Sequence, residues 1–214
     1  GAPLGCLDSA RYGIAWGALV AACGEVLSHR VVQTSILAQA LTLGMLFATL
    51  SSMEGIFSEL FDRGDSFPLW FGVIAVASMI GSILNARLVM RLGMRRLSKY
   101  ALRAFLVLAA IALVVSLLAQ GLPPLWFIAG YLFLSFFCSG LLFGNFNAIA
   151  MEPMGRIAGM AAAIIGSLSS LIAIVTGGYI GQLYNGTVIP LVAGFAGLGL
   201  ATFAVTEWAE RHRR

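Results

Sequence analysis

The residue with the clearest chemical potential is an acidic side chain inside a long apolar stretch near the start of the chain. Glu54 is the only acid well inside a predicted membrane span. Burial in hydrocarbon favours the protonated form of a carboxyl group, and such groups often serve transport. The position therefore predicts a proton-binding site at Glu54. The alternative is an interfacial glutamate near the outer membrane surface, because Asp62 lies only eight residues further on.

Hydroxyl and amide side chains on the first and fourth apolar stretches could line a cavity. Several of them lie among phenylalanines. They are Gln39, Ser51, Ser52, Tyr131, Ser135, Ser139, Asn145 and Asn147. A cavity that mixes large apolar surface with scattered hydrogen-bonding groups suits a bulky amphipathic molecule better than a sugar or an ion. The pattern predicts a small drug-like ligand.

Basic residues mark the point where the second stretch ends. Arg87, Arg91 and Arg95 follow one another at four-residue spacing, so they form a single helical stripe that would attract anionic lipid headgroups. Glu152 and Arg156 lie in a later loop. A pairing of Glu152 with Arg91 or Arg95 would form a gate that holds the cytoplasmic helix ends together. The alternative, given equal weight, is that Glu152 caps the following helix and the arginines face lipid.

The elements that must position these residues are six apolar stretches. The chain is 60% hydrophobic and 10% charged, with a mean hydropathy of +0.95, which is typical of an integral membrane protein. A helix needs roughly 20 apolar residues to cross the hydrocarbon. The expected spans are 34–59, 67–91, 101–120, 124–148, 157–182 and 187–207. We therefore predict an all-α membrane protein with six transmembrane helices.

The distribution of basic residues predicts the orientation. Short cytoplasmic loops collect Lys and Arg, and the basic residues flank the first span, the second turn, the fourth turn and the end of the chain. Both termini are then cytoplasmic, which agrees with an even number of crossings. The net charge of +4 belongs to this asymmetry and does not indicate nucleic-acid binding.

The organisation along the chain is expected to have three parts. Residues 1–32 form a cytoplasmic segment whose residues 12–29 are expected to be an amphipathic helix on the membrane surface, with a re-entrant or packed segment as the alternative. Residues 33–208 form the transmembrane domain, and 209–214 form a basic cytoplasmic tail.

Three segments resemble a known family. Residues 81–96 are similar to the basic loop between the eighth and ninth helices of the major facilitator superfamily. Residues 145–159 and 177–187 resemble the bicyclomycin-resistance (Bcr/CflA) drug exporters around their tenth and eleventh helices. The resemblance covers almost the whole chain and implies the C-terminal, six-helix half of a twelve-helix carrier. It also places Glu59 on an acidic position of these exporters, as a second proton-coupling candidate.

Small residues indicate close helix contacts or a dimer interface. They recur at four-residue spacing in several spans and along much of the fifth, which lets helix backbones approach closely. The candidates are Gly81, Gly166, Ser170, Gly177, Gly178 and Gly181.

The resemblance implies a half-size transporter that a second copy in the same orientation would complete, because the two halves of this superfamily are parallel repeats. We predict proton-coupled efflux in a bacterial inner membrane, with the proton gradient as the energy source and no cofactor or metal. Partners are a second copy, membrane lipids and the substrate. The alternatives are a non-transporting subunit or regulator, and one half of a heteromer. We expect the chain not to be an enzyme, because its sequence shows no nucleophilic side chain paired with a catalytic base.

Overall fold

The computed structural model describes residues 17, 20–61 and 64–211, with the side chains of residues 54, 64 and 67 left out. Glu54, as a side chain, therefore lies outside the described part, as do residues 12–16 and 18–19 of the N-terminal segment and 212–214 of the tail. The long helices are α2 (Arg30–Gly55), α3 (Phe67–Leu92), α4 (Met94–Leu118), α5 (Leu125–Met151), α6 (Ala158–Gln182) and α7 (Ile189–Arg211). Every regular element in the described ranges is helical.

All six long helices are long and apolar enough to cross a membrane. The number and order of the predicted spans are confirmed. The largest difference in bounds is at α4, which begins at Met94 and not at residue 101. Its first turns carry Arg95, Arg96 and Lys99, which are good helix formers and can extend into the headgroup layer. Charge thus marks the membrane boundary here, while the helix continues beyond it.

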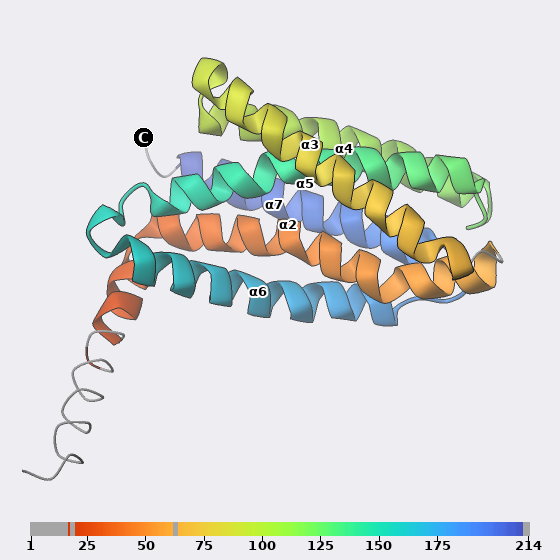
Figure 1. Cartoon of the computed structure of the whole chain (residues 1–214), viewed down its shortest axis with the longest axis horizontal. Coiled ribbons are helices and arrows are strands. Elements are labelled where there is room, and N and C mark those ends of the chain that lie inside the picture. The colour runs from red at the N-terminus through yellow and green to blue at the C-terminus, as the bar shows by residue number, and fades with distance from the viewer. Residues whose placement is uncertain (1–16, 18–19, 62–63, 212–214) are drawn as a thin grey trace, which may run out of the picture.

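Two helices form the centre of the bundle. α2 packs against α6 and α7, α5 packs against α3 and α4, and α2 and α5 also contact each other (Figure 1). The consecutive pairs α3–α4 and α6–α7 contact each other only sparingly. Each group of three consecutive helices therefore packs mainly on the first helix of the other group.

Short connections make consecutive helices run antiparallel to each other. Gly93 separates α3 from α4 by a single residue, and its φ of 78° is a backbone conformation that favours glycine. Its N–H donates to the carbonyl of Val89 and so closes α3. At the opposite end, α2 continues into a π-helical turn, Ile56–Leu60, before the chain reaches α3.

The first residue of α2 and the last of α7 lie at the same end of the bundle (Figure 1). We call this the basic end, because its helix ends and loops carry the described basic residues Arg30, Arg87, Arg91, Arg95, Arg96, Lys99, Arg103, Arg156 and Arg211. Residues 20–28 are helical and lie beside it, with Ala22 and Val26 buried against α2, α5 and α6. This described part of the N-terminal segment thus packs on the protein.

Glycines let the backbones approach most closely where the two three-helix groups cross. A methyl group at Gly177 of α6 would lie 2.6 Å from Phe47 Cβ and 2.8 Å from Ala48 N, both on α2. Gly81 of α3 and Gly140 of α5 form the matching contact at the α3–α5 crossing, against the carbonyls of Phe137 and Ser78. These glycines serve packing within one chain.

The other small residues of α6 are divided between two environments. Gly181 packs on Ser51 of α2. Gly166 and Gly178 have no atom within 4 Å of the place where a side chain would begin, and Ser170 is half-buried. The expected interface residues of α6 therefore do not share one face: Gly177 and Gly181 pack inside the chain, while Gly166 and Gly178 border open space.

Candidate functional site

A groove of about 470 Å³ lies between α2, α3 and α5. Its wall is mostly aromatic and aliphatic, with four hydroxyl groups distributed over the three helices. It is lined by Thr42, Leu43, Leu46, Phe71, Ile74, Ala75, Ser78, Met79, Ser82, Phe136, Ser139, Gly140 and Phe143. A concave apolar surface with a few polar groups is the usual form of a small-molecule site. The groove is the best candidate for a binding site.

Ser139 is the one residue of the sequence-based cavity set that lines this groove. Its hydroxyl donates to the carbonyl of Ser135 at 2.9 Å and lies 3.8 Å from the sulfur of Met45. Ser135 and Tyr131, one and two turns before it, are buried instead. Tyr131 faces Phe195 of α7, with ring centroids 6.0 Å apart. These two side chains belong to the core of the chain.

The remaining polar residues of the groove were not anticipated from the sequence. Thr42 lies on α2, one turn after Gln39, while Ser78 and Ser82 lie on α3 on either side of Gly81. The Ser82 hydroxyl approaches the carbonyl of Gly140 at 3.4 Å. A signal was available in α3, because serines spaced by four residues around a packing glycine indicate the face that meets a neighbouring helix.

Two buried carboxamides lie inside the chain on the two central helices. Gln39 of α2 is 3% exposed and Asn145 of α5 is 1% exposed. Their neighbours Ala38 and Phe146 pack in one cluster, which places the two amides at a similar depth. Gln39 Oε1 and Asn145 Nδ2 have no hydrogen-bond partner in the described structure. Buried polar atoms without partners are costly and rare, so these two are candidates for a functional role.

The candidate acids lie at the end opposite the basic end. Glu54 lies in the last turn of α2, and Glu59 is exposed in the π-helical turn that follows. Such turns are frequent at functional sites. Tyr184, just beyond α6, packs on Gly55. Burial, and secondly the nearby Glu59 carboxylate, raise the pKa of Tyr184, although its buried hydroxyl has no hydrogen bond of normal geometry.

The remaining expected cavity residues do not converge on the groove. Ser52 is buried, Ser51 is exposed beside Gly181, and Asn147 is exposed near the basic end of α5. The structure thus separates the polar residues of the first and fourth spans into groove, core and surface positions.

Ion pairs connect four segments at the basic end. Arg95 of α4 pairs with Glu152 at 3.0 Å, so it is Arg95, of the two arginines proposed, that holds this glutamate. Arg156 pairs with Glu25 of the N-terminal segment, also at 3.0 Å. Lys99 of α4 pairs with Glu210 of α7. Among the candidate gate residues, Arg87 and Arg91 are exposed on α3.

The six apolar helices and the apolar groove define a multi-pass helical membrane protein. Comparisons with protein-family models, with curated proteins and with solved structures found no match. Within the described ranges, no group of three or more His, Cys, Asp and Glu side chains is arranged to hold a metal ion.

Proposed function

We propose that this chain is a half-size secondary transporter that works as a parallel homodimer and exports small amphipathic molecules. The observation that carries the proposal is the groove between α2, α3 and α5. It combines hydroxyl groups with phenylalanine and aliphatic surface, and it is open on one side of the six-helix unit. An open half-site of this kind is what a carrier would have if its binding cavity formed between two such units.

The packing order of the helices supports a half-facilitator fold. α2–α4 and α5–α7 are two groups of three, and the second and third helices of each pack on the first helix of the other. Transporters of the major facilitator type contain inverted three-helix repeats within each six-helix half. The glycine contacts at the two crossings, α2–α6 and α3–α5, are arranged in the same way in both groups.

Helix burial supports assembly with a second copy. α2 and α5 are the most buried spans, at 61% and 56%, whereas α3 and α6 are the least buried, at 17% and 28%. α3 and α6 lie on the flanks of the α2–α5 centre, so a second copy would cover them. The first residue of α2 and the last residue of α7 lie at one end of the bundle, which permits a two-fold axis along the membrane normal.

Energy would come from the proton gradient. Glu54 lies in the last turn of α2 and Glu59 in the π-helical turn that follows, both at the end opposite the basic end. The basic end would face the cytoplasm of a bacterial inner membrane, because short cytoplasmic loops collect Lys and Arg. Protons binding from the outer side at one of these acids would drive alternating access of the groove.

The test combines native mass spectrometry with a transport assay. Native mass spectrometry of the purified chain should give a dimer, and proteoliposomes with a pH gradient should move a fluorescent amphipathic cation. Ser139→Phe fills the groove and should lower transport at least about tenfold. Ala110→Phe, on the exposed side of α4, adds the same ring outside the groove and should change transport less than about twofold.

The role of the acids is tested in the same assay. Glu54→Gln or Glu59→Gln should abolish the dependence on the pH gradient while the protein still folds and dimerises. Glu207→Gln, which removes an acid of α7 at the basic end, is the matched control. A monomer that transports nothing would contradict the homodimer and favour a heteromer or a non-transporting subunit.

A further inference from the structure

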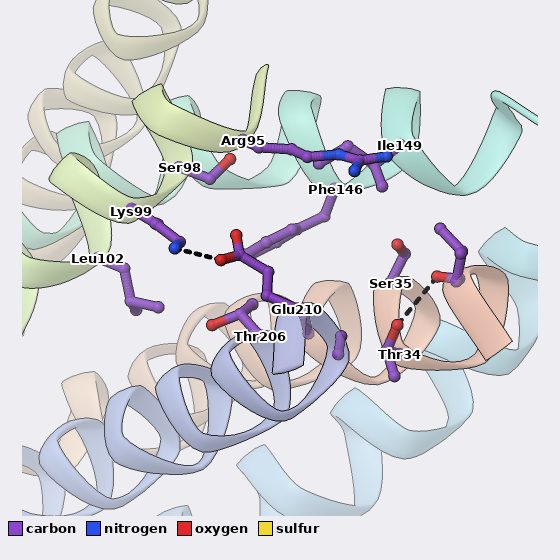
Figure 2. A pocket seen from close by; sticks show the side chains of 13 residues that line it. Thr34, Ser35, Arg95, Ser98, Lys99, Leu102, Phe146, Ile149, Thr206 and Glu210 are labelled. Carbon is purple, nitrogen blue, oxygen red and sulfur yellow. Dashed lines mark hydrogen bonds and ion pairs between the residues drawn. The ribbon is translucent and has the colours of Figure 1, made fainter. Parts of the chain in front are cut away.

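A second cavity lies at the basic end, on the other side of the bundle centre from α3 and α6. It has a volume of about 60 Å³ and lies between α2, α4, α5 and α7 (Figure 2). Its polar lining consists of Thr34, Ser35, Arg95, Ser98, Lys99, Thr206 and Glu210. This volume is far below that of a drug-sized site, but it can hold one group of phosphate size or a few waters.

Two cationic side chains and a buried hydroxyl group line this cavity. Arg95 and Lys99 lie on the first two turns of α4, where the positive end of the helix dipole adds to their charge. Ser35 of α2 is 5% exposed, and Figure 2 shows its hydroxyl pointing into the space between the helices. Within the described residues no hydrogen bond of this hydroxyl occurs, so it is free to donate to a ligand.

The two cations of the cavity are at present held by carboxylates that a ligand could replace. In the Arg95–Glu152 pair the side chains are 44% and 55% exposed, and in the Lys99–Glu210 pair they are 32% and 36% exposed. Ion pairs this exposed contribute little to stability. A phosphate can accept two or three charge-assisted hydrogen bonds and would compete with them.

The surroundings favour an amphiphile over a free ion. Besides these polar groups, the cavity is lined by the apolar side chains of Leu102, Phe146 and Ile149. Outside it, Arg96 is exposed on the first turn of α4, where lipid headgroups would meet the helix end. Charge and apolar contact are thus combined at one mouth, as in basic sites between membrane helices that hold headgroups.

We propose that this cavity binds the phosphodiester group of an anionic phospholipid, with Arg95, Lys99 and Ser35 as donors and Glu210 as a competing carboxylate. The proposal does not depend on transport. Binding would tie α4 to α2 at the basic end and would replace the Lys99–Glu210 pair, which joins α4 to α7.

The experiment uses opposite substitutions in that pair. The full-length chain is purified in mild detergent, phosphatidylglycerol or phosphatidylcholine is added, and native mass spectrometry counts the bound lipids. Lys99→Gln should lower the retention of phosphatidylglycerol about fivefold or more, since one cation near the surface is lost. Glu210→Gln should raise it, because Lys99 is released from its partner and a repelling charge is removed. Both substitutions break the same ion pair. If this pair had only a structural role, both would therefore change lipid retention in the same direction.

Two further measurements keep the result decisive. Arg103→Gln removes an exposed charge of α4 outside the cavity and should change retention less than about twofold. Ser35→Ala should weaken binding without any change in charge. Equal retention of the two lipids, a fall with Glu210→Gln, or an equal loss with Arg103→Gln would overturn the proposal. Displacement of the lipid by millimolar inorganic phosphate would also overturn it and identify a free-anion site.

Discussion

One added methyl group at Gly177 is expected to destabilise the protein by about 1–3 kcal/mol, the usual cost of overpacking. The new Cβ would lie 2.6 Å from Phe47 Cβ and 2.8 Å from the backbone nitrogen of Ala48, and it would also clash with the carbonyl of Gly44. Two of these three atoms belong to the backbone of α2, so no side-chain rotation relieves the contact. α2 and α6 would have to separate by about 0.5–1 Å, and a gap of that size forfeits a quarter to a half of each contact's dispersion energy.

The neighbouring position supplies the control. Gly178 is on the same turn of α6 but has no atom within 4 Å of a new Cβ. Gly178→Ala should therefore be neutral or stabilising by up to about 1 kcal/mol, through helix propensity alone. Thermal unfolding in detergent, followed by circular dichroism, compares the two variants, and each 1 kcal/mol corresponds to a shift of about 2–4 °C. Equal unfolding temperatures for Gly177→Ala and Gly178→Ala would refute the close approach of α2 and α6.

Two further predictions concern polar groups. The raised pKa of Tyr184 means that the folded chain binds this proton more tightly than the unfolded chain does. The contribution of Tyr184 to stability is therefore fully present below the unfolded pKa of about 10, and it is lost as pH rises through the folded pKa. The loss of thermal stability between about pH 9 and pH 11 should therefore be smaller in Tyr184→Phe. Gln39→Leu and Asn145→Leu each remove a buried atom without a partner and should leave stability unchanged or raise it by up to about 2 kcal/mol. If these amides serve the proposed transport, the same variants lose efflux in proteoliposomes. A fall in unfolding temperature would contradict the view that these two buried atoms have no hydrogen-bond partner.

The helices could be predicted from the sequence because each one must satisfy its own backbone in hydrocarbon. A run of about 20 apolar residues between turn signals is sufficient for that. Helix bounds beyond the membrane are a different matter, as α4 demonstrates. Its first seven residues include Arg95, Arg96 and Lys99, which end the apolar pattern without ending the helix.

The groove could not be predicted in the same way, because α5 carries buried residues around most of its circumference. Tyr131, Ser135 and Ser139 share a four-residue spacing, yet only Ser139 reaches the groove. The crossing angle with α3 and the contact with α7 decide which turn faces which neighbour, and neither is written in the apolar pattern of one helix. The ion pair of Glu152 was accessible from the sequence because charges at the same membrane boundary have few other partners.

The positions of the close glycine contacts bear on how such a unit could move. A carrier that alternates access by rocking needs two rigid halves and one interface that changes. Gly177 of α6 packs against α2, and Gly81 of α3 packs against α5, at the crossings that join the two three-helix groups, where a methyl group has no space. Gly166 and Gly178 border open space on α6. The tight contacts thus connect the groups inside one chain, and the outer faces of α3 and α6 carry no such constraint, so in the proposed dimer movement would occur between the chains and not within them.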